Sequence, residues 1–523
     1  MKKYPIGIQS FEKIITENYL YIDKTEFIYN LVNTGNIYFL SRPRRFGKSL
    51  LISTMEAYFL GEKELFKGLK IEKLEDKWVE YPVLHLDLNA KEFINRESVY
   101  RIIDRQLKFY EDKYNIETDS DDIDDRFIDL IIKIKEQTGR QVVVLVDEYD
   151  KPMQQVMRNA AMLNEYRSIL KGFYGVFKTA DPYLKFVFLT GVTKFGKVSV
   201  FSDLNNVKDI TMDERYETIC GITEKELLEN FDEGICELAK RESLTYYEVC
   251  QKLKKWYDGY SFCENGTGLY NPFSILNTFD SLKFQDYWFA TGTPTFLVNM
   301  LKNGNYNMID VEKSKMRDID MSKITVDSGD PVQILYQSGY LTIKDYNKRS
   351  RVYTLGFPNQ EVKEGFYACL APVFLEVKSE KVIAVSIDIK DCLLDDDIDG
   401  FMDIMKEFLP KIPYFFHTNQ KTDERHFQEI FYILLLSAGL NSRVEEYSVR
   451  GRSDIIAESS TSVFVFELKI DKSVEDALQQ IEDKAYIEQY RATKKNIYAI
   501  GVYFNSEKRC IDDYRVCNVY LSR

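Results

Sequence analysis

Residues 37–61, IYFLSRPRRFGKSLLISTMEAYFLG, decide the fold of the first part of this 523-residue chain. The stretch starts with a short apolar run, continues through a basic turn and ends with apolar residues at helical spacing, which predicts strand, loop and helix. Further buried strands are predicted at 83–88 (VLHLDL), 141–150 (QVVVLVDEYD) and 185–194 (KFVFLTGVTK). Because buried apolar runs alternate with helical segments, the sequence predicts an α/β domain with a mainly parallel sheet.

The basic turn matches the phosphate-binding pattern GxxxxGK(S/T) over residues 42–49, RPRRFGKS, except that Arg42 stands in place of the first glycine. In such a loop backbone N–H groups cradle phosphates, the lysine meets the terminal phosphates and the hydroxyl reaches Mg²⁺. The loop arginines have three open roles: phosphate binding, charge stabilisation during reaction, or pairing with acids elsewhere. We predict an ATP site with Ser49 as a magnesium ligand; its residues are Arg44, Arg45, Gly47, Lys48 and Ser49.

Acidic residues end the strand predicted at 141–150. Asp147 is placed to hold the magnesium, and Glu148 is the candidate base that polarises the attacking water. Thr193, at the end of a further strand, is the candidate sensor of the γ-phosphate. The structural alternative is a basic turn capped by Ser49 together with a strand end that faces water. The two motifs on correctly ordered strands favour nucleotide binding, and hydrolysis stays open.

A second candidate site lies in residues 448–470, SVRGRSDIIAESSTSVFVFELKI. Asp454 opens a predicted strand, and Glu467 and Lys469 end its hairpin partner. Alternate side chains of a strand share a face, so the last two point the same way. A charged pair at the end of an apolar strand is costly to bury without compensation. We predict catalysis in which Asp454 and Glu467 hold Mg²⁺ or Mn²⁺ and Lys469 orients the water; the alternative is a surface salt bridge on an edge strand.

Residues around this second motif supply further candidates. A helix is predicted over 473–490, on which Gln480 and Lys484 share a face. We predict that Gln480 touches the metal-bound water or a phosphate. Glu429, on a helix upstream, is either a further metal ligand or an exposed helix acid. Four basic residues are candidates for contacts with nucleic-acid phosphates: Arg450, Arg452, Lys494 and Lys495.

Composition limits the partners. The net charge of −13 requires a local basic groove for any nucleic acid and excludes a basic DNA-coating protein. The eight cysteines include no CxxC pair and no zinc spacing, which indicates reduced thiols in the cytoplasm. The sequence contains no stretch of about 18 uncharged apolar residues, so we predict no membrane span.

The pattern of predicted strands and helices along the chain indicates five regions. They are a P-loop-type region, a helical lid, a winged-helix-like region with a hairpin turning at 346–351, a helical linker and a final α/β region. Their boundaries are, in this order, 1–221, 222–325, 326–375, 376–415 and 416–523.

Several segments, taken together, resemble a known family. They include PIGIQSFEKI, YFLSRPRRFGKSLLISTMEAYFLG, VLVDEYDKP, WYDGYSF, LYNPFSIL, YWFATGTPTFL, RGRSDII and VFVFELKIDKSVEDALQQIEDKAYIEQY. The family consists of bacterial proteins with an AAA-ATPase-like N-terminal domain and a PD-(D/E)XK nuclease C-terminal domain. The resemblance covers nearly the full length of the chain, and it implies that RPRRFGKS is the usual sequence of the phosphate loop in this family. It implies a P-loop NTPase fold, helical and winged-helix-like middle elements and a restriction-endonuclease-like C-terminal domain.

We therefore predict a cytoplasmic, ATP-binding, nucleotide-regulated nuclease that uses magnesium or manganese, with DNA rather than RNA as substrate and no membrane partner. The principal alternative is a nucleotide-switched module that binds nucleic acid or protein without cutting. A third hypothesis is that the protein is chiefly an ATPase and that its C-terminal domain is structural. A homo-oligomer is left open, because related ATPases often form one but no residue here demonstrates it.

Overall fold

The chain forms two compact units in the computed structural model: unit 1 comprises Met1–Trp288 and Ser314–Gln360, and unit 2 comprises Phe289–Lys313 and Glu361–Arg523. The structure describes residues 2–89, 93, 95–157, 159–193, 206–291, 298, 301, 311–322, 330–412, 424–447, 452–483, 486–491, 493, 495–508 and 510–518. For 291, 322, 424–426, 445–447 and 452–454 it describes the backbone alone.

Unit 1 contains the predicted parallel sheet, with strand order β2-β3-β4-β1-β5. Every neighbouring pair of strands is parallel, which confirms the predicted α/β class. The carboxyl ends of parallel strands meet at one edge, so the segments that follow β1, β3 and β4 lie close together. The strand bounds are β1 Ile37–Ser41, β2 Val83–Asp87, β3 Val142–Asp147, β4 Leu184–Gly191 and β5 Lys208–Asp209.

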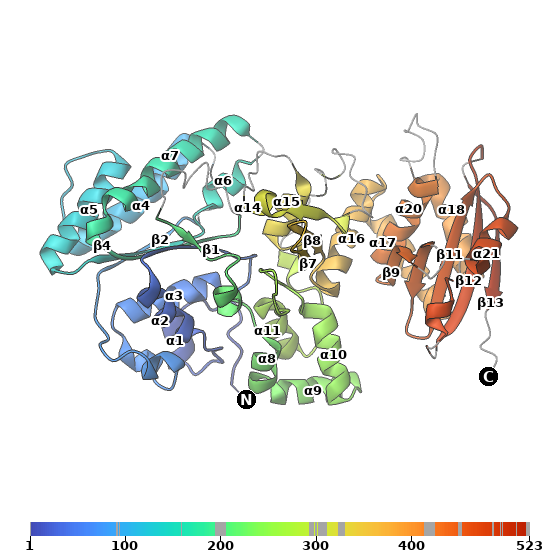
Figure 1. Cartoon of the computed structure of the whole chain (residues 1–523), viewed down its shortest axis with the longest axis horizontal. Helices are drawn as coiled ribbons and strands as arrows, with labels where there is room; N and C mark the ends of the chain where they lie inside the picture. The colour runs from blue at the N-terminus through green and yellow to red at the C-terminus, as the bar shows by residue number, and fades with distance from the viewer. Residues whose placement is uncertain are drawn as a thin grey trace. The chain divides into compact units, whose positions relative to one another are not determined.

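Helices cover both faces of this sheet (Figure 1). One face carries the long amphipathic helices, whose buried residues form one core with Val144 and Val187 of the strands. On the other face Phe59 of α3 contacts Phe186 of β4, with 5.2 Å between ring centroids. The helices of the first face are α4 Arg96–Tyr114, α5 Ile123–Thr138 and α7 Ala160–Thr179; those of the second are α1 Phe11–Thr16, α2 Thr25–Thr34 and α3 Lys48–Phe59.

The remainder of unit 1 is mainly helical, as predicted. The predicted helix and hairpin are present as α15 (Pro331–Ser338), β7 (Thr342–Asn347) and β8 (Val352–Gly356). A third antiparallel strand, β6 (Lys315–Arg317), pairs with β8. The other helices are α6 Lys151–Gln155, α8 Glu224–Asn230, α9 Asp232–Glu242, α10 Tyr246–Tyr257, α11 Pro272–Ser281 and α14 Asp318–Ser322.

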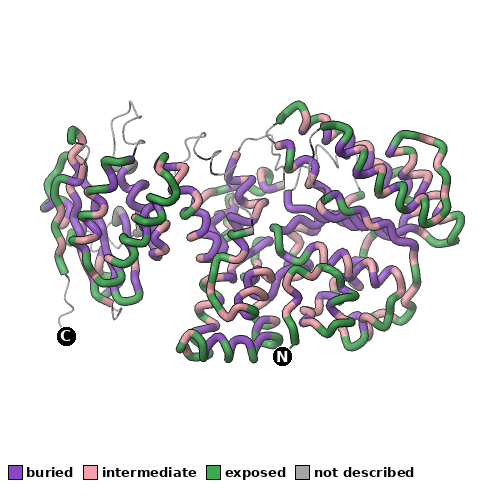
Figure 2. The backbone as a smooth tube through the Cα atoms, turned by 180° about the vertical axis from the view of Figure 1, so that it is seen from behind, coloured by how far each residue is buried: buried purple, intermediate pink, exposed green. Residues whose placement is uncertain are grey.

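Unit 2 contains a second sheet with order β13-β12-β11-β10-β9. Strands β10 and β11 form the predicted antiparallel hairpin, whereas β11 and β12 are parallel, so the sheet is mixed. Strand β11 is central, and its residues are buried along almost its whole length (Figure 2). The strand bounds are β9 Asn441–Tyr447, β10 Arg452–Glu458, β11 Ser462–Ile470, β12 Asn496–Asn505 and β13 Cys510–Asn518.

Helices pack on both faces of the second sheet. Phe466 of β11 contacts Phe401 of α18 and Phe431 of α20 on one face. Val463 and Val465 form a core with Ile481 of α21 on the other. The helix bounds are α16 Gln360–Phe374, α17 Ser379–Leu394, α18 Ile398–Phe408, α20 Glu424–Ser437 and α21 Val474–Asp483. Among the described residues, no helix is both long and apolar enough to cross a membrane.

Candidate functional site

The phosphate-type loop connects the end of β1 to the start of α3. Gly47 precedes the helix with a φ of +94°, and a β-carbon there would meet no atom within 4 Å. Glycine is favoured at this position by the backbone conformation and not by a lack of space for a side chain. Because Gly47 occupies the N-cap, Ser49 lies inside the first turn, and the alternative of a turn capped by Ser49 is wrong. The free N–H groups at the start of this twelve-residue helix suit an anion.

Lys48 is buried behind the loop. Its Nζ donates to the carbonyl oxygens of Arg42 and Pro43, at 3.0 Å each. Burial lowers the pKa of this lysine, and the nearby carboxylates of Glu148 and Asp147 oppose that shift. The ammonium group therefore lies near the acids that follow β3.

Arg42, which replaces the first glycine of the pattern, is 1% exposed and holds the backbone. Its Nη1 donates to the carbonyls of Ser41 and Thr211, at 2.9 and 2.8 Å. Its Nη2 donates to the carbonyls of residues 216–217, at 3.2 and 3.3 Å. The guanidinium carbon lies 4.1 Å from the ring centroid of Phe262. Arg42 thus fastens the loop to a neighbouring segment through main-chain carbonyls.

The other two loop arginines are exposed. Arg44 donates from Nη2 to Oε1 of Gln154 at 3.0 Å. Arg45 has a left-handed φ of 63°, and its guanidinium carbon lies 5.1 Å from the ring centroid of Phe273. Their predicted role in phosphate binding stays a prediction.

The acids at the end of β3 lie mainly inside the protein, so the alternative of a strand end that faces water is wrong. Asp147 is buried, and its Oδ1 accepts from the hydroxyl of Thr190 at 2.8 Å and from the N–H of Glu148 at 3.0 Å. Glu148 is half-buried and has a left-handed φ of 52°, a strained conformation for a residue with a side chain. Its carboxylate lies 3.6 Å from Nζ of Lys151.

Asp150 belongs to the same cluster and was missed by reasoning from the sequence. It is fully buried, and burial raises the pKa of its carboxyl group. It accepts hydrogen bonds from the backbone N–H of Thr193 at 2.6 Å, from the Thr193 hydroxyl and from Nε2 of Gln154. The hydroxyl predicted to sense the γ-phosphate thus contacts Asp150. The fourth letter of DEYD was the only signal, and it could not distinguish a buried carboxylate from a solvated one.

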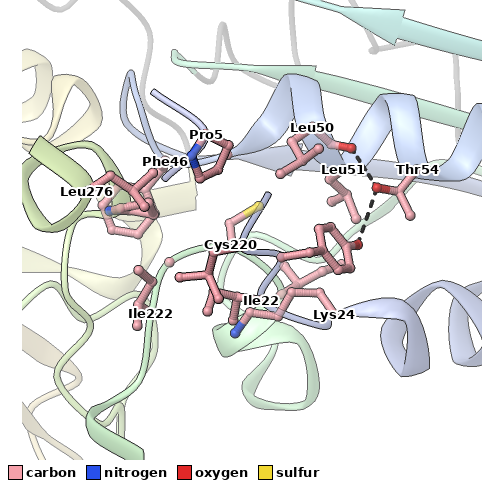
Figure 3. A pocket seen from close by; sticks show the side chains of 16 residues that line it. Pro5, Ile22, Lys24, Phe46, Leu50, Leu51, Thr54, Cys220, Ile222 and Leu276 are labelled. Atoms are coloured by element: carbon pink, nitrogen blue, oxygen red, sulfur yellow. Dashed lines mark hydrogen bonds between the residues drawn. The ribbon is translucent and has the colours of Figure 1, made fainter. Parts of the chain in front are cut away.

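An apolar pocket adjoins the phosphate loop at Phe46 and Gly47. Figure 3 shows its walls, which come from the N-terminal segment, α3, residues 219–222 and α11. The polar groups on the walls are engaged within the protein: Nζ of Lys24 donates to both carboxylate oxygens of Glu226, at 2.6 and 2.7 Å. The apolar lining suits a flat ring such as a nucleotide base. Its apolar residues include Pro5, Leu20, Ile22, Leu50, Ile222 and Leu276.

Glu467 and Lys469 form a buried ion pair on β11. Glu467 is 0% exposed, Lys469 is 6% exposed, and Nζ of Lys469 donates to Oε1 of Glu467 at 2.9 Å. Because β11 is the central strand, the alternative of a surface salt bridge on an edge strand is wrong. Removing two charges from water is expensive, so a buried pair here needs a structural or chemical reason.

The sheet register brings position 454 beside position 467. Ile455 of β10 pairs with Phe466 of β11 in an antiparallel ladder. Asp454 precedes Ile455 and Glu467 follows Phe466, so the two acids occupy neighbouring positions. The side chain of Asp454 lies outside the described residues, and its part in the site stays a prediction.

Helix α21 covers the face on which the pair lies. Val465 packs against α21, and the alternation of a strand puts Glu467 and Lys469 on that same face. Glu467 pairs in the sheet with Gly501 of β12, where a β-carbon would lie 3.0 Å from the carbonyl oxygen of Val474. Glycine at 501 therefore lets α21 approach the sheet closely.

Gln480 is half-buried on α21, and its Nε2 contacts the Tyr486 hydroxyl at 3.4 Å. The helix thus carries this predicted residue to the face of the acid pair. Glu429 is 7% exposed on α20, so it is not an exposed helix acid. Its helix packs on the opposite face of the sheet, through Phe431 and Phe466.

The structure describes two of the residues predicted to contact phosphates: the backbone of Arg452 and the side chain of Lys495. Arg452 lies in β10, with its side chain outside the described residues. Nζ of Lys495 donates to Oε2 of Glu458 at 3.0 Å and to the carbonyl of Ser459 at 2.8 Å. The remaining predicted basic residues lie outside the described part of the chain: Arg450, Lys484 and Lys494.

Comparisons with known proteins agree with this two-part organisation. Residues 5–201 match a family described as predicted AAA-ATPase, and residues 422–514 match one described as PD-(D/E)XK nuclease superfamily. The chain is 34% identical over 517 residues to an uncharacterized protein in the vnfD 5' region of Azotobacter chroococcum mcd 1, covering 98% of each chain.

Among solved structures, the ORC2 protein of Aeropyrum pernix is 12% identical with a TM-score of 0.27, covering 69% of this chain and 98% of that one. The two family matches show an AAA-ATPase-like domain and a domain of the PD-(D/E)XK nuclease superfamily. It belongs to the family in which a predicted AAA-ATPase domain precedes a C-terminal domain of the PD-(D/E)XK nuclease superfamily.

Proposed function

We propose that the protein is an ATP-binding, nucleotide-regulated nuclease that hydrolyses phosphodiester bonds with a divalent metal ion. The observation that carries this proposal is the buried Glu467–Lys469 pair on the central strand, next to position 454. A buried acid and lysine, two residues apart on an apolar strand, contribute little net stability. The cost of burying them is understandable if they serve chemistry.

Carboxylate oxygens are the ligands that Mg²⁺ and Mn²⁺ prefer, and Glu467 with Asp454 would hold such an ion. When bound, the metal supplies a Lewis acid for attack on a phosphodiester. The chain's own residues have separate tasks. Lys469 orients the Glu467 carboxylate through its hydrogen bond and presents a positive charge for the phosphate. Gln480 supplies an amide that orients the attacking water.

In unit 1 the loop and its neighbours are suited to ATP with magnesium. The helix start at α3 and the ammonium group of Lys48 would meet the phosphates, with Ser49 and Asp147 beside the magnesium ion. Glu148 would act on the attacking water. We place the base in the apolar pocket next to Gly47, because apolar walls suit a flat ring.

The substrate we propose is DNA. The net charge of −13 repels a phosphate backbone over the whole molecule, so cleavage depends on local contacts and should weaken steeply with salt.

The test is a nuclease assay on duplex DNA, single-stranded DNA and RNA, with Mg²⁺ or Mn²⁺ and with or without ATP. We expect metal-dependent cleavage of DNA that changes with ATP. Lys469→Met and Asp454→Asn should each lower the rate by about 10²–10⁴-fold. Lys472→Met, on an exposed lysine of the same segment, is the matched control and should cleave normally.

Unchanged cleavage in both site variants would overturn the proposal. Binding of nucleic acid without any product, in the presence of metal and ATP, would instead support the non-cleaving binding module.

A further inference from the structure

Trp288 ends the first segment of unit 1 and contacts the phosphate loop. It is buried, and its indole Nε1 donates to the carbonyl oxygen of Arg44 at 3.0 Å. Its ring meets Tyr340 edge-on, with 5.2 Å between centroids. Trp288 therefore holds the loop backbone through one hydrogen bond from a ring that is itself packed in place.

The same part of the loop is held from a second side. Gly339 has a φ of +87°, and a β-carbon there would lie 2.6 Å from Cβ of Pro43 and 3.6 Å from Cζ2 of Trp288. The turn after α15 thus packs directly on Pro43. The loop residues Pro43 and Arg44 are fixed between this turn and Trp288, and a shift of the loop must move one of them.

Phe289, the next residue, belongs to unit 2. It is buried and lies against Gly365 of α16, where a β-carbon would lie 2.5 Å from Cγ of the Phe289 ring. Two consecutive buried aromatic residues are thus anchored in different units: Trp288 on the phosphate loop and Phe289 on α16. The chain passes between the units at three places, and at this one Trp288 contacts the loop.

Lys48 is the loop residue whose hydrogen bonds a bound nucleotide would change. Its ammonium group donates to the carbonyls of Arg42 and Pro43. When phosphates attract that group, both carbonyls lose a donor, and they precede the carbonyl that Trp288 holds. A signal of this kind requires a contact that differs between the empty and the nucleotide-bound loop, and we expect the Lys48 bonds to supply it.

We infer that Trp288 is a positioning residue of the phosphate loop and that the Trp288–Phe289 step transmits nucleotide occupancy to α16 of unit 2. This inference rests on the proposed nucleotide site and adds the route by which it regulates the rest of the chain. It does not depend on cleavage.

The first test uses tryptophan fluorescence, because the chain has only three tryptophans. In a Trp78→Phe, Trp256→Phe background, Trp288 is the sole indole. We expect a non-hydrolysable ATP analogue with Mg²⁺ to shift its emission with the same Kd that calorimetry gives. Binding by calorimetry with no change in emission would overturn the inference and leave the nucleotide site intact. No binding at all would overturn the proposed nucleotide site, and the inference with it.

The second test is hydrogen exchange on the full chain with and without the analogue. In the natural protein we expect nucleotide to change protection of the amides in 289–291 and α16. Trp288→Phe keeps the ring but removes the N–H donor; it should weaken nucleotide binding about fivefold, as expected for one hydrogen bond, and abolish the change in α16 at saturating nucleotide. Trp256→Phe, on α10, is the matched control and should keep it. A response in α16 that survives Trp288→Phe would overturn the inference.

Discussion

Replacement of Arg42 by methionine tests whether this buried arginine holds the backbone or binds phosphate. The substitution keeps much of the apolar volume but removes all four hydrogen bonds to main-chain carbonyls, at 2.8–3.3 Å. At a net value of about 1 kcal/mol each, their loss destabilises unit 1 by roughly 4 kcal/mol. Loss of the contact with Phe262 adds to this, and relief of the desolvation of the guanidinium offsets it.

The assay is thermal unfolding without nucleotide. For a domain of this size about 2 °C accompanies each kcal/mol, so we expect the Tm of unit 1 to fall by roughly 8 °C. Arg45→Met is the matched control, because this arginine is exposed and lies three residues along the same loop; its Tm should change by no more than about 1 °C. A normal Tm for Arg42→Met together with lost ATP affinity would refute the reasoning and assign Arg42 to the phosphates.

Three further changes test the nucleotide unit. Gly191→Ala would place a β-carbon against the carboxylate of Asp150, so we expect a loss of about 1–3 kcal/mol in unfolding free energy and weaker ATP binding; a normal Tm would show that the acid cluster can shift. Burial lowers the pKa of His85, but the hydrogen bond to Glu56 and nearby acids outweigh it and raise the pKa above 6.5. The Tm advantage over His85→Gln should therefore be full below pH 6.5 and disappear as the pH rises through the raised pKa; a constant difference would contradict this. Glu148→Gln should bind ATP within a few-fold of the natural protein yet lower turnover about 10²–10⁴-fold, and normal turnover would exclude Glu148 as the base.

Local patterns were enough to predict most of the architecture. The strands β1 to β4 are short apolar runs bounded by polar residues, and each run dictates a buried strand without help from distant residues. The β10–β11 hairpin could be predicted for the same reason, because a polar turn separates two apolar runs. The face of Glu467 and Lys469 follows from the two-residue period of a strand.

Contacts between distant segments could not be predicted in this way. The role of Arg42 depends on carbonyls about 170 residues away, and Trp288 reaches a carbonyl 244 residues away. The pocket beside Gly47 is built from five separate stretches, and no local pattern indicates that they meet. Composition also gives no measure of burial, which is why Asp150 could not be distinguished from a solvated acid.

The most direct test of the nuclease site is anomalous diffraction from crystals of the full chain soaked with Mn²⁺. We expect a manganese peak within about 2.5 Å of a carboxylate oxygen of Glu467, with Asp454 as a second ligand, and no such peak in Glu467→Gln. Full manganese occupancy elsewhere in the chain, with none at Glu467, would contradict the assignment of this buried pair to metal-dependent cleavage.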